Sequence, residues 1–111
     1  MTVATDELIR EMAAVVVREV EPEAIILFGS HATGKAVPGS DVDFLVVENG
    51  PFGRGKDRRA EMTRLWRALA GFAVAKDILV YTRDEVERWR GARNHIIARA
   101  LREGRILHGS L

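Results

Sequence analysis

The sequence predicts a small α/β (α+β) fold in which helices pack on a mixed β-sheet. Three apolar segments of strand length, 24–28, 42–47 and 74–81, alternate with longer segments that have helical periodicity. The predicted order is helix, strand, strand, helix, strand, helix, which is typical of helices packed on a small sheet. The chain has 111 residues, enough for one hydrophobic core, so we expect a single domain over 1–111.

The first helix is predicted over residues 5–20. Thr5 is a suitable N-cap, and two acidic residues follow it in the first turn, where the helix dipole favours negative charge. Apolar residues then recur at helical spacing as far as Val20, and Pro22 ends the element. The apolar run 24–28 is predicted to form the first strand.

The middle of the chain holds a turn-rich segment, a strand and a second long helix. Residues 29–41 contain three glycines and a proline, and they have room for one short helical turn. The second strand is predicted over 42–47 and is followed by a loop over 48–53. A helix is predicted over 56–71, with an apolar stripe and a glycine near its end.

The last third is predicted to contain a strand over 74–81 and two helical stretches. Thr82 and Glu85 have the spacing of a capping box, so a helix should begin at residue 83. We expect it to break at Gly91 and to resume over 93–103. Residues 105–108 could form either a short edge strand or a tail.

Composition excludes several classes of site. The chain has no cysteine, which rules out a disulfide scaffold, a thiolate nucleophile and a cysteine-ligated zinc ion. No apolar run approaches the length that spans a membrane, and the first residues lack a signal-peptide pattern, so we expect a cytoplasmic protein without membrane contact. The segment 54–67 has six basic and two acidic residues, which suits either a triphosphate or a solvated helix face.

A Gly-Ser turn after the first strand is the first candidate for chemistry. Gly29 lets the backbone turn sharply and approach a ligand, because it has no Cβ. Ser30 offers a hydroxyl and an N–H group, and both can bind phosphate oxygens. By themselves these two residues more often form an ordinary turn.

Three aspartates form the second candidate. Asp41 and Asp43 are spaced i,i+2 at the start of a strand, so we expect them to face the same side. Two adjacent carboxylates repel each other unless a cation lies between them, and Mg²⁺ prefers oxygen ligands. Asp77 lies in the apolar segment 74–81, where we expect a buried acid, and it would join the other two if the strands are neighbours.

Three acids and a phosphate-binding turn fit a two-metal nucleotidyl transfer. Asp41 and Asp43 would hold both Mg²⁺ ions, one of which would bind the triphosphate. Asp77 would bind the second ion and could receive the proton of the acceptor hydroxyl.

This arrangement resembles a known site motif. Gly29-Ser30, ten intervening residues, Asp41-x-Asp43 and a later strand acid at Asp77 are similar to the DNA polymerase β-type nucleotidyltransferase superfamily. The resemblance implies a short mixed sheet backed by helices, and Mg²⁺-dependent use of ATP or another nucleoside triphosphate.

Further residues resemble the minimal nucleotidyltransferase branch of that superfamily, over roughly residues 8–108. These are Gly34 in the turn and Ser40 before the first aspartate, and the branch implies that Ser40 contributes to nucleotide binding. Many relatives have an arginine where this chain has Thr33, and Lys35 could supply a nearby charge for the nucleotide instead.

The resemblance also implies a partner. Many minimal members are antitoxins beside a small helical HEPN-domain toxin, and some transfer AMP onto it. The leading interpretation is therefore an enzyme, a type VII-like antitoxin that transfers AMP or another NMP to a hydroxyl of a HEPN toxin. One alternative is a catalytically idle antitoxin that neutralises its partner by binding. A second alternative is a nucleic-acid-binding module that uses the arginines of 54–67.

Overall fold

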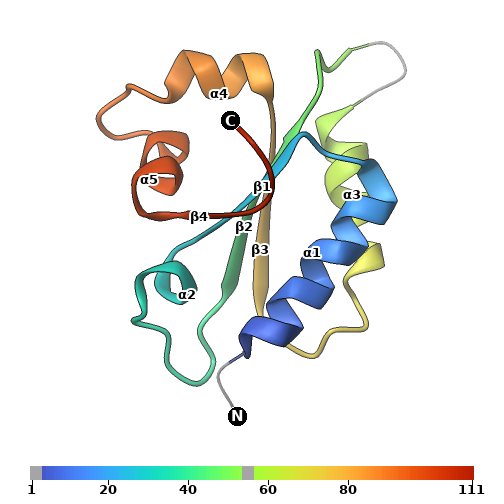
Figure 1. Cartoon of the computed structure of the whole chain (residues 1–111). Helices are drawn as coiled ribbons and strands as arrows, with labels where there is room; N and C mark the ends of the chain where they lie inside the picture. The colour runs from blue at the N-terminus through green and yellow to red at the C-terminus, as the bar shows by residue number, and fades with distance from the viewer. Residues whose placement is uncertain (1–3, 54–56) are drawn as a thin grey trace.

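The computed structural model describes residues 4–53 and 57–111, which form a four-stranded mixed sheet with helices on both faces (Figure 1). The fold class expected from the sequence is confirmed. In chain order the elements are α1 (Asp6–Val20), β1 (Ala24–Phe28), α2 (Ser30–Thr33), β2 (Val42–Glu48), α3 (Arg58–Ala68), β3 (Lys76–Thr82), α4 (Arg83–Trp89), α5 (Ile96–Glu103) and β4 (Arg105–Gly109).

The strand order in the sheet is β3-β2-β1-β4. β2 runs antiparallel to β1 and parallel to β3, and β4 pairs antiparallel with β1. The segment 105–108, which the sequence left open between a strand and a tail, belongs to an edge strand. The parallel pair β2 and β3 is connected through α3, because parallel neighbours need a crossover connection.

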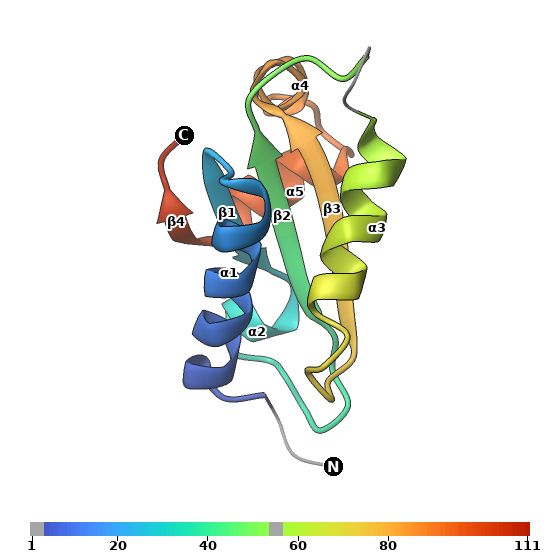
Figure 2. The same ribbon diagram turned by 90° about the vertical axis from the view of Figure 1, so that its right-hand side faces the viewer.

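Two helices cover one face of the sheet. Figure 2 shows α1 and α3 side by side in front of the strands, with α5 behind them. α1 begins where predicted, because the Leu8 N–H donates to the Thr5 hydroxyl over 3.1 Å. α3 begins at Arg58, where the Asp57 side chain accepts from the Arg59 N–H over 3.0 Å. The predicted start of this helix, at residue 56, lies outside the described residues.

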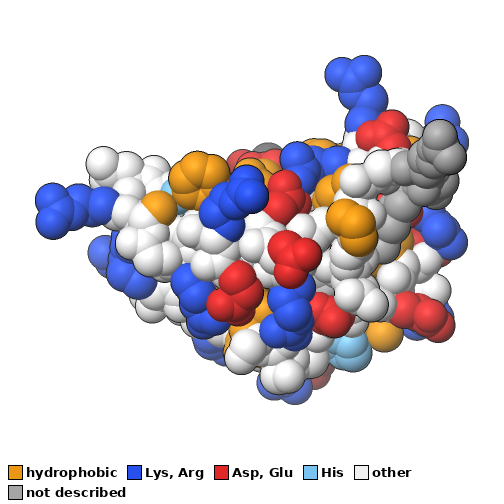
Figure 3. Space-filling model, turned by 90° about the horizontal axis from the view of Figure 1, so that it is seen from above, with side chains coloured by type: hydrophobic (Ala, Val, Ile, Leu, Met, Phe, Trp, Pro, Cys, Tyr) orange, Lys and Arg blue, Asp and Glu red, His pale blue; other side chains and the backbone are white. Residues whose placement is uncertain are grey.

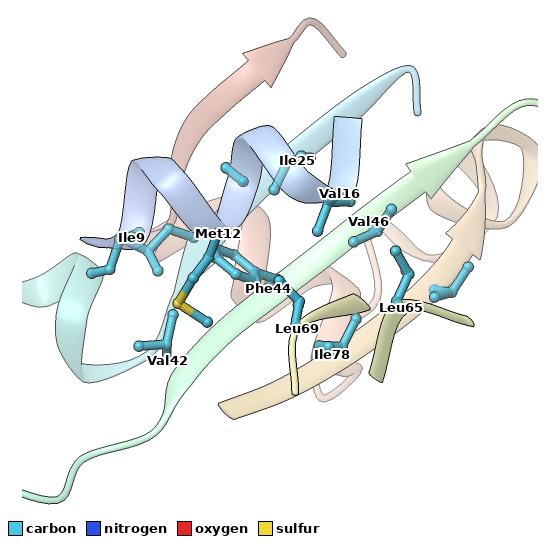
Figure 4. Packing of buried hydrophobic residues seen from close by; sticks show 13 residues of the cluster. Ile9, Met12, Val16, Ile25, Val42, Phe44, Val46, Leu65, Leu69 and Ile78 are labelled. Atoms are coloured by element: carbon cyan, nitrogen blue, oxygen red, sulfur yellow. The ribbon is translucent and has the colours of Figure 1, made fainter. Parts of the chain in front are cut away.

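The core between these helices and the sheet is apolar and fully buried (Figure 4). Met12 and Val16 of α1 lie against Phe44 and Ile25 of the strands, and all four side chains are inaccessible to solvent. These buried side chains come from the segments that the helical periodicity and the apolar runs marked as a helix and as strands. In α3, Met62 packs against this core, whereas Ala60 is exposed.

A second core holds α4 and α5 against the opposite face. It contains Leu45 and Val47 of β2 together with Val86 of α4 and Ile97 of α5. α5 begins at Ile96 rather than at residue 93, because the His95 ring accepts from the Ile97 N–H over 3.1 Å and caps the helix. None of the described helices combines the length and the apolarity that a bilayer crossing demands.

Candidate active site at the meeting point of three strands

The predicted site residues come together because of the directions of three strands. β1 ends where β2 begins, since the two are antiparallel, and Phe28 is the Cα partner of Asp43. β3 begins at the same edge, since it is parallel to β2, and Asp77 is also a Cα partner of Asp43. The turn that starts at Gly29 follows directly after β1. One edge of the sheet therefore holds the Gly-Ser turn and the aspartates.

The side chain of Asp43 points to the sheet face that α4 and α5 cover. Side chains alternate along a strand, and Leu45 and Val47, two and four residues further on, belong to the core beneath these helices. Asp77 shares this face, since it alternates in the same way with Leu79 and Tyr81, which pack against the same core.

Gly29 and Asp43 are packed together without room for another atom. A Cβ built on Gly29 would lie 2.2 Å from Asp43 Oδ2. Gly29 also has φ +73° and ψ −155°, a region of backbone conformation that is essentially restricted to glycine. The glycine therefore serves two purposes here: it turns the chain and it leaves space for the carboxylate.

The pKa of Asp43 reflects both its burial and the neighbouring acids. Its pKa is raised from 3.8 to about 6, first by burial and then by the negative charges of Asp41 and Asp77. The positive charges of His31 and Arg99 act in the opposite direction and lower it. A cation bound beside Asp43 would relieve the repulsion between the carboxylates.

Asp77 is exposed, and the expectation that it is a buried acid was wrong. β3 is an edge strand, so the side of Asp77 away from β2 is open to solvent. β3 does lie beside β2, with Asp77 as the Cα partner of Asp43, which is the strand arrangement that the predicted cluster requires. Asp41, directly before β2, is also exposed, whereas Asp43 is half-buried.

The donors at this edge fit Mg²⁺. They are carboxylate oxygens, and Mg²⁺ in proteins is commonly held by one or two carboxylates together with phosphate oxygens and water. Among residues 4–53 and 57–111, no group of three or more acidic, histidine or cysteine side chains is arranged to hold an ion. A nucleotide phosphate would therefore have to complete the coordination that Asp41 and Asp43 begin.

The loop between Gly29 and Asp41 is held by short polar contacts. The Val37 N–H donates to the Ser40 hydroxyl over 2.9 Å, and the His31 ring lies 3.3 Å from the Ser40 carbonyl oxygen. Ser40 thus shapes the loop that leads into Asp41. Its hydroxyl is already used as an acceptor, so its predicted role in nucleotide binding stays a prediction.

Two other residues of the turn differ in what they offer a nucleotide. The Thr33 hydroxyl lies 3.3 Å from the carbonyl oxygen of Gly29, within the turn itself, and it provides no positive charge. Lys35 is exposed, and its backbone N–H donates to the Ser30 carbonyl over 3.0 Å. A phosphate role for the Lys35 ammonium stays a prediction.

Arg99 of α5 was missed by the sequence interpretation. It lies 56 positions after Asp43 in the chain, and no local motif marks it, yet its charge acts on that carboxylate. A hollow of about 680 Å³ is lined by Asp57 and by residues of α1 and α3, and it includes none of the predicted site residues.

Comparison with known proteins identifies the family to which this chain belongs. The family model described as a nucleotidyltransferase domain matches residues 9–107. The search of curated proteins gave no significant match.

Solved structures with the same fold are found among toxin–antitoxin complexes. One is a toxin–antitoxin complex with AMP-PNP, with 21% identity, a TM-score of 0.57 and coverage of 91% of this chain and 73% of that chain. A second is the toxin–antitoxin pair MntA–HpeT in mutant form, with 19% identity, a TM-score of 0.56 and coverage of 91% and 73%. A third is the tri-AMPylated Shewanella oneidensis HEPN toxin in complex with MNT antitoxin, with 18% identity, a TM-score of 0.54 and coverage of 96% and 74%.

Proposed function

We propose that this chain, which belongs to the nucleotidyltransferase domain family, transfers AMP from ATP to a hydroxyl group of a partner protein. The observation that carries the proposal is the packing of Asp43 against Gly29, with Asp77 beside it in the next strand. The glycine turn that can receive phosphate and the carboxylates that can hold Mg²⁺ thus occupy one edge of the sheet.

In the proposed reaction, the acceptor oxygen forms a bond to the α-phosphorus while the bond from that phosphorus to the pyrophosphate oxygen breaks. Asp41 and Asp43 would hold Mg²⁺, and the turn at Gly29 and Ser30 would bind phosphate oxygens. When bound, two Mg²⁺ ions supply positive charge that stabilises the departing pyrophosphate and favours loss of the acceptor proton.

The exposure of Asp77 supports its proposed role as the group that receives the acceptor proton. A hydroxyl that belongs to another protein must reach the base from outside, and Asp77 lies on an edge strand that is open to solvent. The proton would pass from the acceptor hydroxyl to the carboxylate as the new phosphorus–oxygen bond forms.

We propose a HEPN-domain toxin as the partner. Three structural neighbours are toxin–antitoxin complexes, and one of them contains an AMPylated HEPN toxin with its MNT antitoxin. Val37, in the loop that leads into Asp41, is 60% exposed and offers an apolar contact beside the site.

Direct binding of nucleic acid is less well supported than nucleotidyl transfer to a protein. Figure 3 shows the face at the α4 end of the molecule, where cationic and anionic side chains are interspersed. A nucleic-acid-binding surface instead has lysine and arginine side chains clustered on one face, where they contact phosphates. The arginines of 54–67 are in part outside the described residues.

The experiment that tests the proposal uses the chain co-expressed with the toxin and ATP that carries a label on its α-phosphate. We expect label on the toxin with the wild-type chain and none with the double variant Asp41→Asn, Asp43→Asn. Undiminished labelling by the double variant would contradict the mechanism. Neutralisation of the toxin without any labelling, by wild type and double variant alike, would show an antitoxin that acts by binding alone.

A further inference from the structure

β4 forms an edge of the sheet that is suited to a further strand. Among the described strands it pairs with β1 alone, so one side of its backbone has no strand beside it. Ile106, in the middle of β4, is 55% exposed. Exposed edge strands tend to pair with another strand, and monomeric proteins commonly protect them with a central lysine or a proline. β4 contains neither of these residues.

A groove lies between this edge and α1. It consists of two hollows, of about 390 and 340 Å³, and Arg10 and Leu107 line both of them. The smaller hollow extends to Asp6, and the larger one extends to Val17 and Arg18. We call the two hollows together the edge groove. Figure 2 shows α1 beside β4 and α3 over the opposite edge of the sheet.

α1 and β4 run in the same direction along the edge groove. Arg105, the first residue of β4, lies 3.6 Å from Asp6 at the start of α1. His108, near the end of β4, lines the groove together with Arg18 from the last turn of α1. A two-fold axis perpendicular to the sheet that places β4 antiparallel to a second β4 therefore also places α1 antiparallel to a second α1.

The charges of α1 are complementary in this arrangement. The first turn has the acids Asp6 and Glu7, the last turn has Arg18, and all three residues are exposed. Within residues 4–53 and 57–111, Arg18 takes part in none of the ion pairs. Antiparallel helices bring the first turn of one copy beside the last turn of the other, so opposite charges meet twice across the axis. Parallel helices would instead bring like charges together, which is unfavourable.

An irregularity in β4 limits what backbone hydrogen bonds can contribute at this edge. His108 is the Cα partner of Ile25, and Ile106 is the Cα partner of Ile26, so Leu107 is an extra residue in β4. A bulge bends the strand and shortens any ladder of hydrogen bonds that forms on it. Apolar contacts of Ile106 and Leu107 and the charges of α1 must therefore supply much of an interface here.

We propose that a second copy of this chain packs against the edge groove about a two-fold axis, with β4 antiparallel to β4 and α1 antiparallel to α1. This inference goes beyond the proposed function and does not depend on it. The aspartates of the candidate site precede or belong to β2 and β3, and β1 separates these strands from β4. The dimer therefore leaves both candidate sites open to nucleotide and to a toxin.

The first test is the oligomeric state of the full chain without any partner, measured by sedimentation at concentrations up to about 0.5 mM. We expect the wild type to form a dimer as the concentration rises. Ile106→Lys should be monomeric, because pairing would remove the new charge from water. Its thermal unfolding should be almost unchanged, since Ile106 is more than half exposed. Val37→Lys, at an apolar residue with 60% exposure outside the edge groove, is the matched control and should still dimerise.

Reversal of charge tests the two-fold arrangement itself. Asp6→Arg and Arg18→Asp should each weaken the dimer about tenfold, because each replaces two attractions by two repulsions. The double variant should regain most of the wild-type affinity, and an equimolar mixture of the two single variants should form a heterodimer. Arg67→Asp, at the last-turn arginine of α3, controls for the reversal of a charge at a helix end.

Three results would overturn the inference. One is a wild type that stays monomeric at the highest concentration. Another is a dimer that Ile106→Lys leaves intact, because its interface would then lie elsewhere. The third is a double variant that dimerises no better than the single variants. If the wild type is monomeric and Ile106→Lys no longer binds the toxin, the edge groove belongs to the toxin instead of a second copy.

Discussion

Gly29 and Asp43 lie in such close contact that a methyl group on the glycine would sit 2.2 Å from the Asp43 carboxylate. Gly29 directly follows β1 and Asp43 is the second residue of β2, and the antiparallel pairing of the two strands brings them together. Because of this contact, a side chain introduced at Gly29 would displace the Asp43 carboxylate.

We predict that Gly29→Ala abolishes nucleotidyl transfer and destabilises the fold by at least about 2 kcal/mol. The new methyl group forces Asp43 to move, and the backbone at φ +73° strains any residue that has a Cβ. Urea unfolding and label transfer measure the two effects.

Gly34→Ala is the matched control for this variant. Gly34 also has a positive φ, +77°, but a Cβ there would meet nothing within 4 Å. It should cost about 1 kcal/mol through backbone strain and leave much of the transfer activity. Equal loss of activity in both variants would show that the turn, and not the contact with Asp43, matters.

We predict that Asp43→Asn stabilises the metal-free protein at neutral pH by about 1 kcal/mol. The raised pKa means that the charged carboxylate is less favourable in the folded protein than in the unfolded chain. The Asp43 side chain is half-buried, so solvent screens part of the unfavourable charge. We therefore expect a smaller change in the free energy of unfolding than the full pKa shift would give.

The same group gives a pH dependence whose sign follows from proton binding. Between pH 3.8 and about 6 the folded protein keeps a proton on Asp43 that the unfolded chain has released. The contribution of Asp43 to the free energy of unfolding therefore falls as the pH rises through this range. Urea unfolding of wild type and Asp43→Asn at several pH values measures it, and parallel curves for the two would contradict the assignment.

We predict that Mg²⁺ with AMP-PNP raises the unfolding temperature of the wild type and not that of Asp43→Asn. A ligand that binds only the folded state stabilises it by an amount that increases with the ratio of ligand concentration to Kd, and the variant lacks a predicted ligand of the ion. A thermal shift assay with and without chelator measures the difference. Equal shifts in both proteins would place the ion elsewhere.

We predict that Asp77→Asn lowers the rate of transfer at least about tenfold with a change in stability below about 0.5 kcal/mol. Asp77 is exposed, so its replacement leaves no buried group without a partner, whereas the reaction loses its proposed proton acceptor. Glu11→Gln, at an exposed position of α1, controls for the loss of one negative charge. A variant that transfers at the wild-type rate would exclude Asp77 from the chemistry.

The elements with local signals were predicted from the sequence. Thr82 is an example: its hydroxyl accepts from the Glu85 N–H over 3.2 Å, and the Glu85 carboxylate accepts from the Thr82 N–H over 2.9 Å, as the spacing indicated. Four neighbouring residues decide such a cap, so a single sequence contains the information. The motif Gly29-Ser30 and Asp41-x-Asp43 is local in the same sense.

The features that depend on contacts between distant segments were predicted less well. The exposure of Asp77 depends on β3 being an edge strand, and an apolar run does not show which strand forms an edge. The effect of Arg99 on Asp43 depends on how α5 packs across the sheet. The start of α5 depends on the His95 cap and on the Trp89 ring, which stacks on His95 at 4.5 Å.

The most direct test of the account is the position of the label that reaches the partner. The chain and the toxin are incubated with Mg²⁺ and with ATP labelled on either the α- or the γ-phosphate. Attack at the α-phosphorus predicts that the toxin retains the α label, that the γ label leaves as pyrophosphate, and that the double variant Asp41→Asn, Asp43→Asn transfers neither. Retention of the γ label on the toxin would show phosphoryl transfer and contradict the account.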